Sequence, residues 1–271
     1  MASPLEAALR RERSITLAAL AALALLAWAW LILGAGMGMG AHAELTPFPH
    51  RSADGGMAGM DMGMGAPTAW TAVRLFLTFS MWWVMMVAMM LPAATAVILL
   101  YARAVPRDGQ KQHPSTGVFL AGYLIVWGLF SLVAAALQAA LDLSGLLAPM
   151  TMGSGTRWFS AAILIAAGLY QLSPLKDACL AHCRNPAVFL SRHYRPGRAG
   201  ALRLGVLHGA YCVGCCWLLM ALLFVGGVMN LAWIALLTLL VAGEKLLPGG
   251  HRLALFAGAG FIAWGAFVAL A

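Results

Sequence analysis

The residues best suited to chemistry lie close together in an apolar stretch in the second half of the chain. They are one histidine and three cysteines: His208, Cys212, Cys215 and Cys216. On a helix of about 3.6 residues per turn, all four positions fall within an arc of about 100°. Ionisable groups inside an apolar span usually mark function, and thiolates with imidazole bind Zn²⁺ or Cu(I). The spacing therefore predicts a metal site; a redox dithiol and the packing of cysteines as small apolar side chains are the alternatives.

A second apolar stretch carries methionines at helical spacing. Met81, Met85 and Met89 fall within about 80° of a helix surface, and Met86 and Met90 lie beside them. A methionine stripe alone is more typical of core packing than of metal binding. Side chains along one helix diverge, however, so the cysteine site needs ligands from another helix, and this stripe is the candidate. Thioethers and thiolates together favour Cu(I), although Zn²⁺ is compatible with the cysteine and histidine cluster alone.

A third group of soft ligands follows Pro174. Cys179, His182 and Cys183 are spaced i, i+3 and i+4, so a single helical turn after this proline would bring them together. In a reducing cytoplasm such thiols stay available for metal. The pattern predicts metal or thiol chemistry, and the alternative is a basic interfacial loop whose cysteines are incidental. His193 is expected to be a surface histidine in a basic patch that faces lipid.

Between the first two apolar runs lies a segment rich in methionine and glycine. Its core, GMAGMDMGMG, has no helical or strand period and can bury almost nothing, so residues 37–69 are expected to form a solvated loop. Thioethers suit Cu(I) and, unlike thiols, are not lost to disulfides outside the cell. The segment is interpreted as a site of metal capture, with a Gly-rich linker as the alternative. Its candidate ligands are Met57, Met60, Met62 and Met64.

The composition places these ligands in a membrane protein. Of the 271 residues, 62% are hydrophobic and 10% are charged, whereas a soluble domain has roughly 25% charged residues. This excludes a soluble enzyme and a disulfide-stapled secreted module. The net charge of +8 would suggest nucleic acid in a soluble chain, but here the basic residues form short clusters between apolar runs, as in membrane topology. We therefore expect the protein to lie in a lipid bilayer and to bind no nucleic acid.

The apolar runs predict an all-α, polytopic membrane protein with about seven transmembrane helices. A spanning helix needs about 20 mostly apolar residues. The candidate runs are 15–36, 70–101, 116–140, 156–173, 202–225, 228–243 and 253–271. In the second run, Pro92 should bend the helix and leave one carbonyl without its helical partner.

The basic residues predict the orientation of these helices. Fourteen of the 17 fall on one side if seven helices alternate, which puts the N-terminus in the cytoplasm of a bacterium and the chain in its inner membrane. Three regions follow: an N-terminal anchor helix over 1–36, an extracytoplasmic loop over 37–69, and a six-helix membrane domain over 70–271. That domain includes a cytoplasmic basic loop over 174–203. We expect the first run to stay uncleaved, with a signal peptide as the alternative.

Several of these motifs resemble one known family. The segments WWxMMxAMMLP, GLYQLSPLKDACLAHCRNP and HGAYCVGCCW, followed by Glu244-Lys245, are similar to a bacterial family of predicted metal-binding integral membrane proteins of unknown function. The resemblance runs from the second to the sixth expected helix and leaves out the Met-rich loop. It implies metal binding, without a transport direction or reaction. The positions that it marks are Met81 to Met90, Cys179, His182, Cys183, His208, Cys212, Cys215 and Cys216.

Together these features predict a membrane Cu(I)-binding protein that takes part in copper transport, delivery or homeostasis. Cu(I) would pass from the outer methionines to the mid-membrane ligands and then to the group after Pro174. A binding role is favoured over an enzymatic one, and the sequence contains no P-loop for ATP. The expected partner is a periplasmic or membrane copper-handling protein, with an oligomer or a larger complex also open. The alternatives are a quinone-linked thiol–disulfide oxidoreductase and a copper-binding accessory or scaffold subunit.

Overall fold

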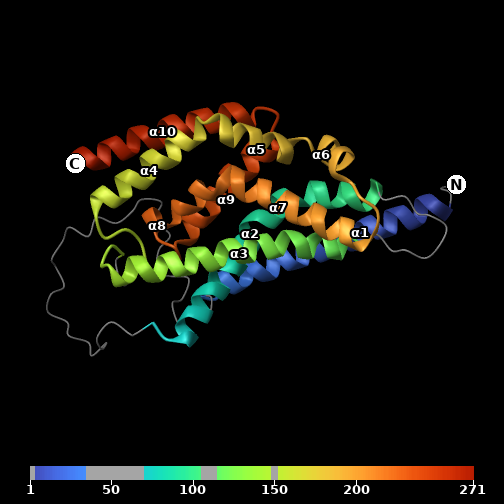
Figure 1. Cartoon of the computed structure of the whole chain (residues 1–271), viewed down its shortest axis with the longest axis horizontal. Coiled ribbons are helices and arrows are strands. Elements are labelled where there is room, and N and C mark those ends of the chain that lie inside the picture. The colour runs from blue at the N-terminus through green and yellow to red at the C-terminus, as the bar shows by residue number, and fades with distance from the viewer. Residues whose placement is uncertain (1–3, 35–69, 105–114, 148–151) are drawn as a thin grey trace.

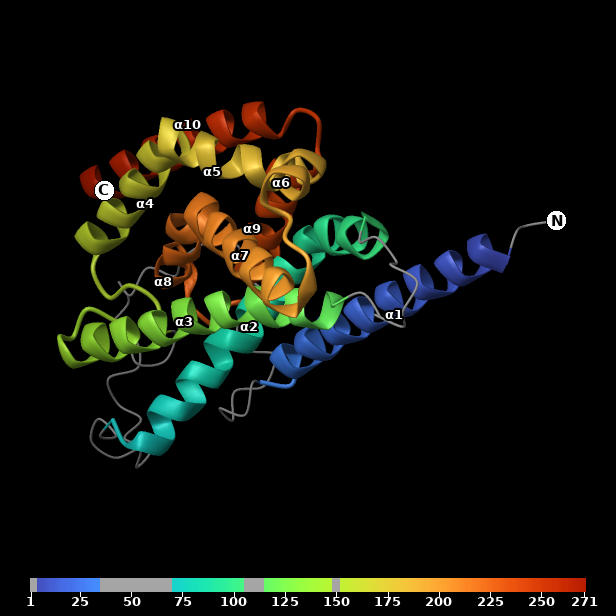
Figure 2. The same cartoon turned by 45° about the vertical axis from the view of Figure 1, so that its right-hand side comes forward.

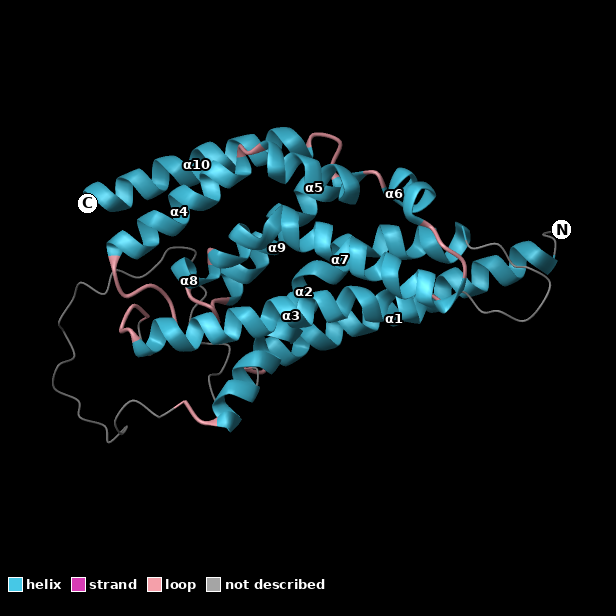
Figure 3. Cartoon of the chain, in the orientation of Figure 1, coloured by secondary structure: helices cyan, strands magenta, loops and turns pink. Residues whose placement is uncertain are grey.

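The computed structural model of the protein describes residues 4–34, 70–104, 115–147 and 152–271. These ranges form helices joined by short connections and contain no named β-strand, which confirms the all-α prediction (Figure 3). The Met-rich segment with Met57, Met60, Met62 and Met64 lies outside the described residues, so its role in capture stays a prediction. The helices are α1 (Pro4–Ile32), α2 (Ala72–Ala104), α3 (Thr116–Leu143), α4 (Arg157–Gln171), α5 (Pro174–Arg184), α6 (Pro186–His193), α7 (Gly197–Ala221), α8 (Leu223–Gly226), α9 (Leu231–Leu246) and α10 (Gly250–Leu270).

Five helical segments are long and apolar enough to cross a membrane. They are α1 from Ser14 onward, α2, α3, α7 together with α8, and α10. A sixth span results only if α4 and α5, which meet at an angle of 63°, are counted as one broken span. The structure thus supports five or six spans, whereas the sequence led us to expect seven. The cytoplasmic location of the N-terminus stays a prediction.

Two of the seven expected runs do not form a single helix long enough to span a membrane, and the causes are local in the sequence. Proline disfavours helical backbone at the residue before it, and Ser173, which precedes Pro174, is extended with φ −84° and ψ 143°. The run 156–173 therefore stops there, and α5 starts in a new direction. The run 228–243 becomes α9, which has 16 residues and ends at Leu246, two residues before Pro248. A helix of that length is about 24 Å long, shorter than the roughly 30 Å of hydrocarbon in a bilayer.

The helices pack in three layers (Figures 1 and 2). α4 and α10 lie along each other at one side, α7 and α9 run through the middle, and α3, α2 and α1 form the opposite side. α5 leaves the outer layer and packs along α7, while α9 contacts both α2 and α10. The segment 174–203, expected as a basic loop, therefore contains α5, α6 and the first turns of α7.

Small residues allow the middle and lower layers to approach closely. A Cβ added to Gly122 of α3 would lie 2.5 Å from the Leu202 carbonyl oxygen of α7, and one added to Gly205 would overlap the carbonyl of Phe119. Close backbone approach at small residues is a common way for membrane helices to associate, because lipid provides no hydrophobic driving force between them. This contact fixes α7 against α3, and with it the cysteines that α7 carries.

Pro92 shapes α2 in the way that the sequence predicts. It lies inside the helix, and the ribbon of α2 changes direction along its length (Figure 2). Because proline has no N–H, the carbonyl four residues earlier, that of Ala88, loses its helical donor. The indole Nε1 of Trp28 on α1 donates to that oxygen at 3.2 Å. The bend thus creates an acceptor that connects α1 to α2.

Candidate metal centre

The three cysteines of α7 are buried inside the protein, and none forms a disulfide. The thiols of Cys215 and Cys216 both donate to the Cys212 carbonyl, at 3.1 Å and 3.0 Å. Such local hydrogen bonds to a carbonyl three or four residues earlier satisfy a polar side chain inside an apolar helix. The thiol of Cys212 differs from the other two, because an ammonium group and a hydroxyl group of other helices lie beside its sulfur.

Two polar side chains converge on the sulfur of Cys212. The Lys245 ammonium of α9 donates to Sγ at 3.0 Å, and the Tyr123 hydroxyl of α3 lies 3.2 Å from the same atom. The Tyr123 hydroxyl also lies 3.2 Å from the Met90 carbonyl oxygen, to which it donates. Cys212 therefore stands where α2, α3, α7 and α9 meet. A sulfur that accepts a hydrogen bond from an ammonium group is suited to carry the negative charge of a thiolate.

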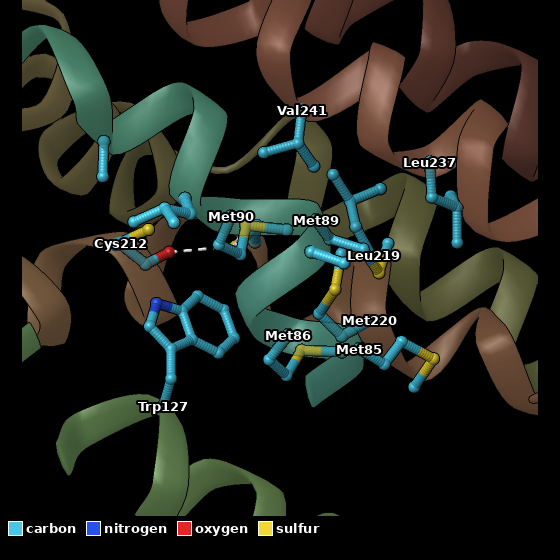
Figure 4. Close-up of a cluster of buried hydrophobic side chains, with 14 of the residues drawn as sticks. Met85, Met86, Met89, Met90, Trp127, Cys212, Leu219, Met220, Leu237 and Val241 are labelled. Atoms are coloured by element: carbon cyan, nitrogen blue, oxygen red, sulfur yellow. Dashed lines mark hydrogen bonds between the residues drawn. The ribbon is translucent and has the colours of Figure 1, made fainter. Parts of the chain in front are cut away.

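The methionine row reaches the cysteines through Met90. Its Sδ lies 3.9 Å from Cys216 Sγ, and Figure 4 shows Met90 beside Cys212. In the same view Met85 and Met89 lie toward Leu219 and Met220. Adjacent positions on a helix are about 100° apart, so rows one residue apart face different neighbours. The sequence identified the correct helix, whereas the thioether that touches a cysteine comes from the row beside the expected stripe.

The expected stripe is part of the hydrophobic core. Met81, Met85 and Met89 are buried and belong to the main cluster of apolar side chains, as methionine often does in irregular cores. Among the described residues, no hydrogen bond joins their sulfur atoms to a cysteine, whereas one joins Met90 to Cys216. Their role as ligands therefore stays a prediction, and Met90 is the better placed candidate.

The helix after Pro174 forms, but its three predicted ligands face different neighbours. Ser173 caps α5 by accepting from the Lys176 N–H at 3.2 Å. Cys183 interacts with the thiols of Cys212 and Cys215, so it lies near them. Because α5 packs along α7, Cys183 joins the α7 cysteines instead of forming a separate inner site.

Cys179 and His182 turn away from that meeting point. A Cβ built on Gly214 would lie 2.9 Å from Cys179 Sγ, so the sulfur rests against the bare face of this glycine. The ring of His182 stacks on Tyr211 with ring centroids 4.0 Å apart and planes within 3°. Its Nδ1 donates to the Ala178 carbonyl at 2.8 Å. The two residues lie in the contact between α5 and α7, four residues and one residue before Cys183.

His208 lies in a pocket of aromatic rings. It is 2% exposed, and its ring stacks on Tyr123 with centroids 5.7 Å apart and lies 5.4 Å from the ring of Phe189. Among the residues described, its Nδ1 has no hydrogen-bond partner. A buried polar atom without a partner is unfavourable and is uncommon in proteins. The thiols of Cys212 and Cys215 interact electrostatically with His208, so the ring lies near them.

These ligands adjoin one another without surrounding one point. Over the described ranges, no group of three or more His, Cys, Asp or Glu side chains is arranged to hold a metal ion. The soft ligands of α5 and α7 are therefore not arranged as a closed site in this part of the chain. The reason is local: Cys215 and Cys216 direct their thiols at a backbone carbonyl, and His208 is held among aromatic rings.

A buried ion pair lies beside the thiols and was missed by the sequence reasoning. Lys176 Nζ of α5 contacts Glu244 Oε2 of α9 at 2.6 Å, and Gln171 Nε2 donates to Glu244 Oε1 at 2.6 Å. Lys176 and Lys245 were counted among the basic residues that set topology, yet they are 0% and 7% exposed. The adjacent acid and base at Glu244-Lys245, at the end of an apolar run, were the signal that could have revealed their burial.

Comparison with known proteins identifies the family. A family model for PpoB2, a copper chaperone, matches residues 79–268. The chain belongs to this copper chaperone family. The matched range begins in α2 and ends in α10, so it contains Met90, Cys183, Cys212 and Lys245 and leaves out α1 and the Met-rich segment. No curated protein and no solved structure matches the chain. Copper, which the soft ligands led us to expect, is thus also the metal in the description of this family.

Proposed function

We propose that this protein binds Cu(I) as cargo at the point where α2, α5 and α7 meet, and delivers it to a partner. The observation that carries the proposal is the position of Cys183 next to Cys212 and Cys215, because it brings thiols from two separate helices together. Met90 adds a thioether from a third helix, 3.9 Å from Cys216. Thiolate and thioether ligands select Cu(I) among biological metals. Membership of the copper chaperone family supports the same metal.

The incomplete arrangement of the ligands suits a carrier better than a storage site. A structural metal site closes around its ion with a full set of fixed ligands. Here, Cu(I) would take the thiolate of Cys212 and one neighbouring thiol, with Met90 and His208 near enough to join or leave. Stepwise exchange between a few soft ligands lets an ion move on without becoming hydrated. Binding strong enough for entry and weak enough for exit is the general requirement for passage through a membrane protein.

The two other predicted groups would act before and after this site. We assign initial capture to the thioethers of Met57, Met60, Met62 and Met64. Cys179 and His182, which precede Cys183 on α5, would accept Cu(I) as it leaves the thiols. The direction of this passage follows from the predicted topology, with the Met-rich segment outside the cell. The receiving partner is a copper-handling protein of the periplasm or the membrane.

The test is anaerobic titration of the purified, detergent-solubilised protein with Cu(I) in competition with a coloured Cu(I) chelator. Replacing Cys212 or Cys183 by Ser removes one of the two thiolates, and we expect the affinity to fall at least tenfold, as metal sites lose 10- to 100-fold even on loss of a supporting residue. Ser131→Ala in α3 is the control, because it changes a buried side chain that carries neither sulfur nor imidazole; its hydroxyl donates to the Trp127 carbonyl. If the double variant of Cys183 and Cys212 binds Cu(I) like the unmodified protein, the proposed site is wrong.

The contact between Cys183 and Cys212 also favours a second candidate, a thiol–disulfide oxidoreductase. Oxidation of this pair would form one S–S bond and release two protons and two electrons, which a membrane quinone would accept. Mass spectrometry after alkylation distinguishes the two functions. A protein isolated without copper, in which a Cys183–Cys212 disulfide forms as quinone is reduced to quinol, would favour the oxidoreductase, whereas free thiols that bind Cu(I) favour the carrier.

A further inference from the structure

Lys245 is a buried cation that faces the thiols. It lies in the last turn of α9, is 7% exposed, and places Nζ 3.0 Å from Cys212 Sγ. Its charge also interacts with the thiols of Cys215, Cys216 and Cys183. A lysine side chain has three donors and no acceptor, so it cannot itself be a ligand of a metal ion while it is charged. The ammonium group therefore acts on the site through its charge.

Within the described ranges, no carboxylate neutralises this ammonium group. The neighbouring Glu244 uses one oxygen for Lys176 and the other for Gln171, both at 2.6 Å. A buried charge is unfavourable unless it is paired. The partner that the structure gives to Lys245 is the sulfur of Cys212, so one positive charge is already present wherever a metal ion binds to that sulfur.

From this arrangement we infer that Lys245 restricts the copper site to monovalent soft cations. The inference rests on the proposed function and adds a selectivity to it. An ion bound to Cys212 would lie on the order of 4 Å from the ammonium group, because both contact the same sulfur. For the same set of ligands, Zn²⁺ meets twice the repulsion that Cu(I) or Ag(I) meets. At that separation and an effective dielectric constant of about 20, one extra unit of charge lowers the affinity on the order of 1000-fold.

Selection by charge complements selection by softness. Soft ligands favour Cu(I), but three thiols and an imidazole also form an acceptable zinc site. The ammonium group penalises Zn²⁺ without weakening the preference of sulfur for Cu(I). It also offsets the negative charge of a site in which two thiolates hold one monovalent ion, so that the buried group is neutral as a whole. A divalent ion in the same place would leave an excess positive charge in the protein interior.

The test compares Ag⁺, a redox-stable probe for Cu(I), with Zn²⁺ on the full chain in detergent, without oxygen and at one fixed pH. Competition titrations give the ratio of the two affinities for the unmodified protein, Lys245→Leu and Lys245→Arg. Leucine has no charge and no ligand atom, whereas arginine keeps the charge. We expect Lys245→Leu to raise the Zn²⁺ affinity relative to Ag⁺ about 1000-fold, and Lys245→Arg to keep the ratio of the unmodified protein.

The outcomes distinguish a failure of the proposed function from a failure of the inference about Lys245. An unmodified protein that binds neither Ag⁺ nor Cu(I) overturns the proposed function itself. If it binds Ag⁺ but Lys245→Leu leaves the ratio unchanged, the selectivity role of Lys245 is wrong and the copper site stands. Should Lys245→Leu fail to fold, Lys245→Gln replaces it with the same expectation. An unmodified protein that binds Zn²⁺ as tightly as Ag⁺ overturns the inference without any variant.

Discussion

The thioether of Met90 on α2 lies 3.9 Å from the thiol of Cys216 on α7, across 126 positions of the chain. Met89, the next residue, is equally buried but faces the apolar core (Figure 4). These neighbours form a matched pair of equal size and chemistry. They separate the contribution of a thioether at the thiols from that of a thioether used for packing.

We expect Met90→Leu to weaken Cu(I) binding by about tenfold, the lower end of the losses measured when metal sites lose a supporting residue. Met89→Leu should leave the affinity unchanged, since leucine replaces a packing side chain of similar volume. Titration against a Cu(I) chelator measures both. Equal losses for the two variants would show that the methionine row acts as a whole, and a loss for Met89→Leu alone would restore the stripe predicted from the sequence.

The hydrogen bond from Trp28 to Ala88 should stabilise the protein only as long as residue 92 is proline. Trp28→Phe removes the donor and leaves a carbonyl without a partner, which costs about 1–3 kcal/mol. In a Pro92→Ala background the N–H of residue 92 can serve that carbonyl again, so Trp28→Phe should cost much less. Unfolding in a detergent titration gives the four free energies. The same cost in both backgrounds would contradict the account.

Gly214 should be sensitive to substitution because Cys179 rests against it. A Cβ at this position would lie 2.9 Å from Cys179 Sγ, and overpacking of this kind costs about 1–3 kcal/mol. Gly260→Ala in α10 is the control, because nothing lies within 4 Å of a Cβ placed there. The control should raise the free energy of unfolding by about 0.5–1 kcal/mol, since alanine is the better helix former. Equal tolerance of alanine at both positions would place α5 farther from α7 than the structure does.

Glu244→Gln should destabilise the protein strongly. It leaves Lys176 buried without its carboxylate, and removal of one partner from a buried pair costs about 3–5 kcal/mol. Asp142→Asn is the control, because the pair of Asp142 with Arg74 is partly exposed, at 26% and 33% of the side chains, and such pairs contribute up to about 1 kcal/mol. Thermal unfolding in detergent compares the two. A smaller shift for Glu244→Gln than for Asp142→Asn would mean that water reaches Lys176.

Local sequence signals were sufficient for much of the fold and for the metal. The apolar run 70–101 corresponds to α2, 116–140 to α3 and 253–271 to α10, because long apolar segments must be helical in a membrane. Pro92 indicated both the bend and the freed carbonyl before any partner was known. The soft ligands indicated copper, and the family match confirms a copper-related role.

Other features depend on how the helices pack, which the sequence does not encode locally. Periodicity places Met85 and Met90 on neighbouring rows of one helix, but the neighbours of α2 decide which row meets the cysteines. Cys183 was assigned to a separate inner site because its distance from Cys212 along the chain hides the packing of α5 along α7. The two lysines were counted only among the basic residues that set topology, because Glu244 and Cys212 become their partners only in the folded protein.

The break between α4 and α5 at Ser173 has a consequence for how the two thiols of the proposed copper site are held. Cys183 belongs to α5, a separate piece of 11 residues set at 63° to α4, whereas Cys212 belongs to a long helix fixed by close glycine contacts with α3. The Cys183 sulfur is therefore carried by a short helix that meets α4 at an angle, and the Cys212 sulfur by a long helix that packs closely on α3. Besides the bridge from Lys176 to Glu244, α5 is held by the contact of Asp177 with His251 at 3.2 Å and by its packing along α7. The separation of the two sulfurs therefore depends on contacts between helices, because no continuous helix joins α5 to α4.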